Sequence, residues 1–275
     1  LVSEARTQLK PDHDPNSPAV QGDKRSRALG QSANRITLLR DADGDGVAER
    51  REVFVRDQNQ PFGMALVDGR FYVGNTDGVV AFDYREGATR LEGSGERLAR
   101  FKPGGHWTRS LLASPDGRRL YAGVGSLTNV ADEGMEAEAG RASIWELDLT
   151  TGAAREYATG LRNAVGLAFE PESGALWTVV NERDGLGDET PPDYLTSVQE
   201  GGFYGWPYSY YGQHVDVRVE PQRPDLVERA IGEQREIARH LQELPRVGVD
   251  PDAEFALLAP CHHVGARARH GDHEI

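Results

Sequence analysis

Two groups of polar residues in the sequence could carry out chemistry, and each lies just before a predicted strand. The first is His106, within residues 104–109, and the second is Arg162 with Asn163. A histidine can act as a general base near neutral pH. An arginine offers a rigid fork of donors, and an asparagine offers both a donor and an acceptor. By residue type alone, an ordinary packed or surface side chain is the favoured interpretation of His106, and Arg162 could be a strand-end arginine in a surface ion pair.

A run of alternating carboxylates forms the clearest metal-binding pattern. Asp41, Asp43 and Asp45 are followed by Gly46 and, after five further residues, by Glu52. This spacing matches the twelve-residue calcium loop, in which hard oxygen atoms coordinate the ion. An EF-hand also needs a helix on each side, whereas the flanking residues predict strands, so we expect no EF-hand fold. A calcium site and an Asx-rich hairpin turn without an ion both remain open.

Other segments could also line a site. Residues 181–189 contain four carboxylates with glycines, which could bind a hard cation or form a solvated loop. Residues 201–212 are rich in aromatic side chains, which could line a sugar or cofactor slot or pack in the core. One cysteine and four histidines near the C-terminus have the residue types of a zinc site but no ordered zinc spacing. They are Cys261, His262, His263, His270 and His273.

Repeated β-hairpins are the elements that would position these residues. Each repeat reads as a strand, an Asp-Gly or Ser-Gly turn and a second strand. The repeats span residues 62–74, 110–125 and 165–180. Aligning Met64, Leu112 and Leu167 separates them by 48 and 55 residues, which matches the four-stranded blade of a β-propeller. We therefore predict an all-β propeller with about four blades. Equivalent positions in neighbouring blades converge on one axial funnel, which favours a shared site for His106 and the Arg162–Asn163 pair.

Two segments depart from the blade pattern. Residues 6–33 are polar and rich in Pro, Asp and Ser, which predicts a long loop. Residues 225–244 carry apolar side chains at helical spacing, which predicts a short helical segment near the C-terminus. We therefore expect propeller blades over residues 1–222, incomplete at both ends, and a helical segment with an irregular tail over residues 223–275.

Composition and missing motifs exclude several classes of function. The net charge is −13, which disfavours nonspecific nucleic-acid binding. No apolar run approaches the roughly 20 residues of a membrane-spanning helix. A single cysteine excludes an internal disulfide framework. The absence of a G-x-S-x-G motif, a phosphate loop and a dinucleotide fingerprint argues against serine hydrolases and nucleotide enzymes.

Taken together, the motifs resemble the soluble, six-bladed sugar dehydrogenases that depend on pyrroloquinoline quinone (PQQ). The resemblance is greatest to the sorbosone dehydrogenase branch, and it covers residues 34 to about 218. Six motifs in order carry it: NRITLLRDADGDG (34–46), QPFG (60–63), GGHWTR (104–109), GLRN (160–163), NERD (181–184) and GGFYGWP (201–207).

The resemblance implies PQQ- and calcium-dependent oxidation of a sugar such as sorbosone or glucose, by hydride transfer to the quinone. It implies that His106 is the general base that takes the proton of the sugar hydroxyl. It also implies that Arg162 and Asn163 hold the carbonyl oxygens of the quinone. The backbone carbonyls of Arg183 and Asp184 match the family's calcium ligands, although the family usually has Gly-Pro there. A periplasmic or secreted location is the corresponding expectation, although the sequence shows no signal peptide.

Nothing after residue 218 resembles the further blades of the family. We therefore expect a truncated or frame-disrupted member that is weak or inactive alone. Two other functions fit a propeller of this composition. One is a calcium-dependent, lactonase-like hydrolase that is active without a quinone. The other is a non-catalytic propeller that binds a partner and is insensitive to His106→Ala. Neither accounts for both His106 and the Arg162–Asn163 pair.

Overall fold

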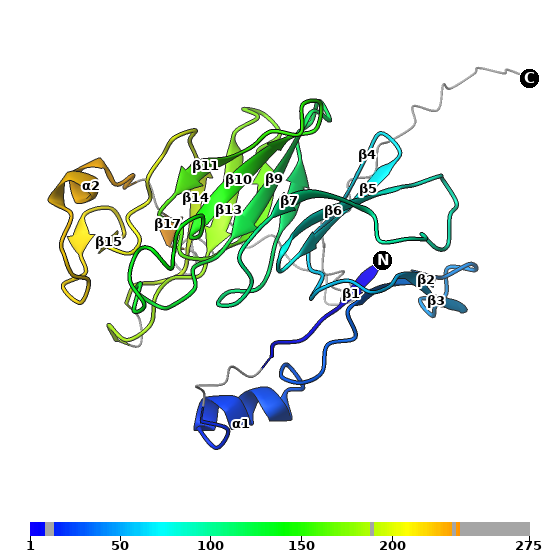
Figure 1. Ribbon diagram of the computed structural model, residues 1–275, viewed down its shortest axis with the longest axis horizontal. Helices are drawn as coiled ribbons and strands as arrows, with labels where there is room; N and C mark the ends of the chain where they lie inside the picture. The colour runs from blue at the N-terminus through cyan, green and yellow to red at the C-terminus, as the bar shows by residue number, and fades with distance from the viewer. Residues whose placement is uncertain (9–13, 188–189, 233–234, 237–275) are drawn as a thin grey trace, which may run out of the picture.

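Antiparallel β-sheets make up most of the computed structural model, shown in Figure 1. The structure describes residues 1–8, 14–187, 190–232 and 235–236. Among these residues, four sheets of three or four strands follow one another along the chain, and neighbouring strands in each run antiparallel. The first contains β1 (Val2–Glu4), β2 (Arg35–Arg40) and β3 (Arg50–Val55). The second contains β4 (Met64–Val67), β5 (Arg70–Asn75), β6 (Gly78–Asp83) and β7 (Glu96–Arg100). The third contains β8 (Leu111–Ala113), β9 (Arg119–Val124), β10 (Ser143–Asp148) and β11 (Ala154–Thr159). The fourth contains β12 (Ala164–Phe169), β13 (Leu176–Val180), β14 (Tyr194–Val198) and β17 (Arg235–Glu236).

The repeated hairpins predicted from the sequence are confirmed as the first two strands of the second, third and fourth sheets. They are the pairs β4–β5, β8–β9 and β12–β13. The four sheets confirm the prediction of about four blades. The acidic run 41–46 lies in the connection between β2 and β3, so the flanking elements are strands and the EF-hand fold is absent there, as expected.

The blades pack face to face through apolar clusters, because both faces of each sheet bear apolar side chains. Alternation along β5 illustrates this: Phe71 and Val73 pack toward the first sheet, and Tyr72 packs toward the third. Along β9, Leu120 packs against the second sheet and Tyr121 against the fourth. The core is therefore a series of layers between consecutive blades, and β8 lies against both β4 and β12.

The prediction of a continuous loop over residues 6–33 is wrong, because helix α1 (Pro18–Arg25) forms there. The Ser17 hydroxyl accepts a hydrogen bond from the backbone N–H of Val20 and caps the helix, and Pro18 occupies the first turn. The sequence signal for this start, Ser-Pro, was therefore present. In Figure 1 α1 lies apart from the four sheets.

The predicted helix over residues 225–244 is much shorter in the structure. Helix α2 (Pro224–Arg229) ends where Ala230 becomes extended and the N–H of Ile231 donates to the carbonyl of Phe203. Residues 235–236 form β17, which pairs with β14, so this part of the C-terminal segment adds to the fourth sheet. Residues 237–244 and the Cys/His segment from Cys261 lie outside the described residues. A small sheet of β15 (Ser209–Tyr210) and β16 (His214–Val215) precedes α2.

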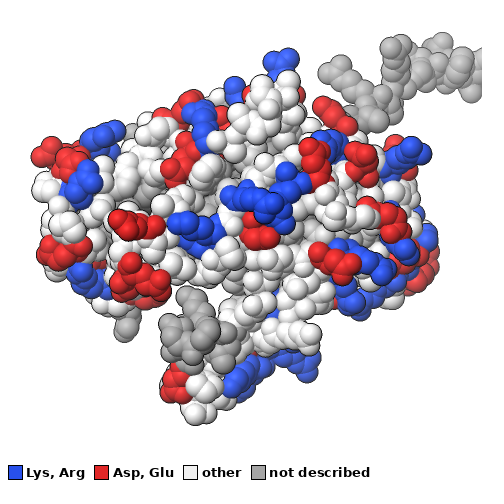
Figure 2. Space-filling model, in the orientation of Figure 1, with Lys and Arg blue, Asp and Glu red and all other residues white. Residues whose placement is uncertain are grey.

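Charged side chains of both signs alternate over the face shown in Figure 2, which presents no extended basic patch. Within the described part of the chain, the helices are too short and too polar to span a bilayer.

Candidate functional site

The predicted site residues lie in connections at one edge of the third and fourth sheets. His106 precedes β8, and Ser126 follows β9, which is paired antiparallel to β8. Arg162 and Asn163 precede β12, and Asn181 follows β13 in the same way. An antiparallel pair brings the start of one strand beside the end of the next. The blade pattern therefore places these residues at equivalent positions of neighbouring blades, as expected from the sequence.

His106 is half-buried and is anchored to Ser126. Its backbone N–H donates to Ser126 O at 3.0 Å, and its ring Nδ1 lies 2.9 Å from Ser126 O and 3.1 Å from Ser126 Oγ. The Ser126 hydroxyl donates its own hydrogen to Thr128 O at 2.7 Å, so both serine oxygens act as acceptors toward the ring. Nδ1 therefore carries the proton in the neutral imidazole, and the lone pair lies on Nε2. This is the tautomer that a general base at Nε2 requires.

Gly125 brings His106 and Asn163 together. A β-carbon placed on Gly125 would lie 2.4 Å from Asn163 Oδ1 and 2.5 Å from His106 Cβ. Only a residue without a side chain fits between them, so the two side chains flank one point of the backbone. Asn163 is 8% exposed, and its Oδ1 is buried without a hydrogen-bond partner among the described residues. An unsatisfied buried acceptor is unfavourable by about 1–3 kcal/mol, and the amide could meet a polar ligand with either its oxygen or its NH2 group.

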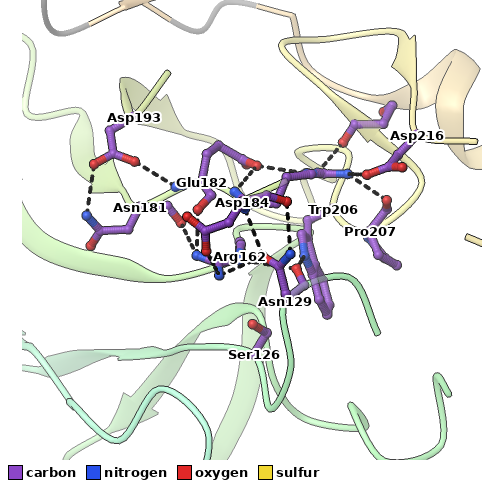
Figure 3. Close-up of polar contacts among 12 residues, drawn as sticks. Ser126, Asn129, Arg162, Asn181, Glu182, Asp184, Asp193, Trp206, Pro207 and Asp216 are labelled. Atoms are coloured by element: carbon purple, nitrogen blue, oxygen red, sulfur yellow. Dashed lines mark hydrogen bonds and ion pairs between the residues drawn. The ribbon is translucent and has the colours of Figure 1, made fainter. Parts of the chain in front are cut away.

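Arg162 is buried and all five of its N–H groups bond to the protein (Figure 3). Nε donates to Asn129 O at 3.2 Å, and Nη1 donates to Asn181 O at 3.3 Å and to Glu182 O at 2.6 Å. Nη2 donates to Asn129 Oδ1 at 2.9 Å and lies 3.3 Å from Asp184 Oδ2. Burial lowers the pKa of Arg162, and the nearby carboxylates partly offset this. A direct contact between Arg162 and a quinone would need one of these bonds to be exchanged.

Asn129 organises this part of the site and was missed by the sequence analysis. Its carbonyl accepts from Arg162 and, at 3.0 Å, from the indole N–H of Trp206. Its side-chain Oδ1 accepts from the backbone N–H of Asp184 at 2.9 Å, and its Nδ2 donates to Asp184 O at 3.0 Å (Figure 3). Asn129 therefore ties the connection after β9 to the connection after β13. Nothing in the residues next to it along the chain indicates this role.

The predicted calcium ligands show a different arrangement from the one that the resemblance implies. Asp184 O accepts from Asn129 Nδ2 and, at 2.9 Å, from Arg218 Nη1. A carbonyl oxygen has two lone pairs, and here two donors, one of them cationic, use both. The described arrangement of Asp184 therefore does not fit a calcium ion at this carbonyl. The Arg183 side chain is fully buried and forms ion pairs with Glu182 at 2.9 Å and with Asp216 at 3.2 Å.

The acidic run between β2 and β3 does gather carboxylates, but with one change of residue. Ligand oxygens of Asp41, Asp43, Asp45 and Glu49 lie within 4.8 Å of one another, and all four residues are exposed. Glu49 takes the place predicted for Glu52, which lies on β3 and pairs with a neighbouring arginine. The cluster also makes Asx-type bonds to its own backbone, such as Gly44 N–H to Asp41 Oδ1 at 2.7 Å. Both sequence interpretations of this loop thus remain open.

Three of the six aromatic side chains in residues 201–212 are buried, and the other three are half-buried. Tyr204, Trp206 and Tyr208 are 1%, 2% and 5% exposed. These three side chains therefore act as core and anchoring residues rather than as the lining of a sugar slot. Within the described ranges, the acidic loop before β3 is also the one cluster of three or more His, Cys, Asp or Glu side chains close enough to share a metal ion, and it lies on a different blade from His106. A lactonase-like site with side-chain carboxylates around His106 is therefore not supported.

Comparisons with known proteins identify one family model and two curated relatives that are similar to this chain. The model of the TrAA12-like family matches residues 28–208. A pyrroloquinoline quinone-dependent sugar dehydrogenase of Hypocrea jecorina (strain QM6a) is 25% identical over 179 residues, which cover 55% of this chain and 42% of that protein. An uncharacterized protein of Borreliella burgdorferi is 31% identical over 106 residues, which cover 38% of this chain and 27% of that protein. The match thus spans less than half the length of either curated relative.

Solved structures show the same architecture. The calcium structure of the Trichoderma reesei carbohydrate-active enzyme of family AA12 superposes with a TM-score of 0.60 at 21% identity, covering 72% of this chain and 60% of that chain. The holo form of the pyranose dehydrogenase PQQ domain from Coprinopsis cinerea superposes with a TM-score of 0.55 at 19% identity, covering 64% of this chain and 50% of that chain. These similarities confirm the predicted propeller fold.

Proposed function

Because the chain belongs to the TrAA12-like family of PQQ-dependent sugar dehydrogenase propellers, we propose that it oxidises a sugar with PQQ as the cofactor. The observation that carries this proposal is the convergence of His106 and Asn163 on the two sides of Gly125. A base in a defined tautomer and a buried amide oxygen without a hydrogen-bond partner among the described residues thus lie together at the inner edge of two blades. An aldose such as glucose, or sorbosone, is the proposed class of substrate.

The chain's own residues have distinct parts in this reaction. Bound PQQ supplies an acceptor for two electrons. His106 takes the proton of the sugar hydroxyl at Nε2, and Ser126 stabilises the resulting imidazolium because both of its oxygens still accept from Nδ1–H. The Asn163 amide holds a polar atom of the cofactor. Arg162 supports this wall through Asn129 and the backbone of residues 181–182.

Calcium is proposed as a second cofactor because of the family to which the chain belongs. None of the residue roles given above depends on it. The calcium structure is that of the Trichoderma reesei relative. In this chain the Asp184 carbonyl is occupied by donors from Asn129 and Arg218. PQQ binding is therefore best measured both with calcium and with a chelator.

The proposal is tested by calorimetric titration of the chain with PQQ and by dye-linked oxidation of a panel of aldoses. We expect saturable binding and turnover for the wild-type chain. His106→Asn should retain PQQ binding and lose turnover by about 10²–10⁴-fold, the usual contribution of a general base. His214→Asn is the matched control, since His214 is exposed on β16 and should behave as wild type.

The outcomes separate the candidate functions. A folded chain that does not bind PQQ under either condition would refute the proposal. Hydrolysis of a sugar lactone without PQQ would instead support the lactonase-like alternative. PQQ binding with turnover that His106→Asn leaves unchanged would remove His106 from the mechanism.

A further inference from the structure

Two buried arginines hold the loop that ends at His106. Arg109 is 0% exposed and Arg141 is 5% exposed. Arg109 Nη1 donates to His106 O at 2.6 Å and to Thr108 O at 2.9 Å, and its Nη2 donates to Lys102 O at 3.2 Å. The carbonyl of the proposed base itself is therefore bonded to a fully buried guanidinium group.

Arg141 grips the same loop from the connection before β10. Its Nη2 donates to Lys102 O at 2.8 Å and to Pro103 O at 2.6 Å, and its Nη1 donates to Gly104 O at 3.1 Å. Nη1 also lies 3.4 Å from the carbonyl of Gly125, the residue that separates His106 from Asn163. Four carbonyls of the loop, those of residues 102, 103, 104 and 106, thus point at two guanidinium groups.

Arg109 and Arg141 place two positive charges close together in the interior of the protein. Both guanidinium groups contact the same oxygen, Lys102 O, so two like charges lie close together away from water. Within the described residues no carboxylate forms an ion pair with either group, and the Nε atoms of both have no hydrogen-bond partner. Burial and the charge of Arg141 lower the pKa of Arg109 to about 9, and burial lowers that of Arg141. Loop carbonyls are the groups hydrogen-bonded to both charges. The carboxylates of Asp77, near Arg109, and of Glu138 and Glu133, near Arg141, partly offset the effect of burial. The loop and the arginines thus depend on each other.

The loop also packs tightly against Ser126 O, the oxygen that accepts a hydrogen bond from the His106 ring. Gly105 has φ +60°, and a β-carbon there would lie 2.5 Å from Ser126 O, the oxygen that accepts from the His106 ring. The curvature of residues 102–106 consequently sets the distance between the imidazole and Ser126. A small shift of this loop would release Nδ1 from its acceptors.

We propose that Arg109 and Arg141 are positioning residues for the base: they hold residues 102–106 so that His106 Nδ1 stays bonded to Ser126 and the lone pair stays on Nε2. The catalytic use of this tautomer rests on the proposed function. The positioning itself is a property of the chain alone and can be measured without PQQ.

The test replaces Arg141, because its bonds to the loop are made with both terminal nitrogens. Arg141→Met removes every one of them, and Arg141→Lys retains the charge on a single ammonium group that cannot span the same carbonyls. Histidine ring ¹⁵N signals are recorded at a pH well above the ordinary imidazole pKa of about 6.5. The His106 signals are assigned by their loss in His106→Gln. We expect one tautomer, protonated at Nδ1, in the wild-type chain, and averaged Nδ1 and Nε2 shifts in both Arg141 variants.

In the loaded enzyme we expect kcat to fall by about 10²-fold in Arg141→Met, the loss typical of a misplacement near 1 Å, while KM for the sugar stays at its wild-type value. Val80→Ala is the control for stability, because Val80 is 4% exposed and packs between the first and second sheets. It should lower stability without changing the His106 signals.

Wild-type ring signals in a folded Arg141→Met chain would overturn the proposal. If that variant does not fold, the ring signals and kcat of Arg141→Lys decide in the same way. If the wild-type chain shows the single tautomer and Arg141→Lys loses it, but PQQ does not bind, the positioning stands and the proposed function fails.

Discussion

Replacing Gly125 with alanine tests the central geometry of the site, because it adds one methyl group between the two residues that define it. The new β-carbon would lie 2.4 Å from Asn163 Oδ1 and 2.5 Å from His106 Cβ. Ordinary contacts of a β-carbon begin near 3.4 Å. Both side chains, or the backbone between them, would therefore have to move by about 1 Å, since well-packed sites do not absorb an extra methyl group without a shift.

The expected effects differ in size for stability and for activity. Overpacking of this kind lowers the free energy of unfolding by about 1–3 kcal/mol. A displacement near 1 Å at the reacting groups lowers turnover by about 10²-fold. The same displacement moves the Asn163 amide, so we also expect weaker PQQ binding. Activity should thus fall far more than the loss of stability can explain.

Urea unfolding, PQQ titration and dye-linked sugar oxidation measure the three quantities on one preparation. Gly22→Ala is the matched control, because a β-carbon at Gly22 in helix α1 meets no atom within 4 Å. It should stabilise the chain slightly, by up to about 1 kcal/mol, since alanine favours the helix more than glycine. Wild-type stability, PQQ affinity and turnover in Gly125→Ala would show that His106 and Asn163 do not share one site.

Three further predictions concern two buried carboxylates near the site and the acidic loop between β2 and β3. The buried carboxylate of Glu138 accepts hydrogen bonds from the backbone N–H groups of Leu127 and Thr128 at 2.7 and 3.0 Å. Both donors lose their acceptor in Glu138→Ala, so we expect the free energy of unfolding in urea titrations to fall by about 3 kcal/mol. An unchanged unfolding midpoint would contradict this. Burial opposes ionisation of Asp216, but hydrogen bonds from two arginines more than offset it and hold its pKa at about 2, below the ordinary 3.8. Asp216 therefore contributes about 2 kcal/mol of stability above pH ~4 that is lost as the pH falls toward 2, and Asp216→Asn should flatten this part of a stability–pH curve. If the acidic loop binds calcium, Glu49→Gln should weaken binding in calorimetry and Glu52→Gln should not; the reverse result would favour the ligand spacing predicted from the sequence.

Much of the fold could be predicted from the sequence, because its signals are local. The repeated hairpins around Met64, Leu112 and Leu167 are visible as alternating apolar residues around tight turns, and the structure contains all three. Helix α1 was missed although Ser17 and Pro18 mark its start, since the surrounding residues lack an apolar period. The short extent of α2 could not be seen, because a distant contact of Ile231 with Phe203 ends the helical path.

The candidate site likewise contains residues that local sequence patterns indicate and residues that only the fold brings into place. His106, Arg162 and Asn163 could be predicted to lie near one another because they precede equivalent strands of a repeat, and the structure places His106 and Asn163 on either side of Gly125. Asn129, and the exchange of Glu49 for the predicted Glu52, could not be predicted, because their roles depend on how connections fold in space.

The sequence by itself determined the blade repeat, the family and the residue types available for proton transfer, since periodicity and motif order are properties of the chain. Only the tertiary structure decided how those residues are used. It places Ser126 against the ring of His106, commits all five N–H groups of Arg162 to the protein, and turns four loop carbonyls onto Arg109 and Arg141. Apart from the bond between Arg109 and the carbonyl of His106, these contacts join residues far apart in the chain. Blade packing and the burial of charge set their pairing, and no local pattern in the chain indicates it.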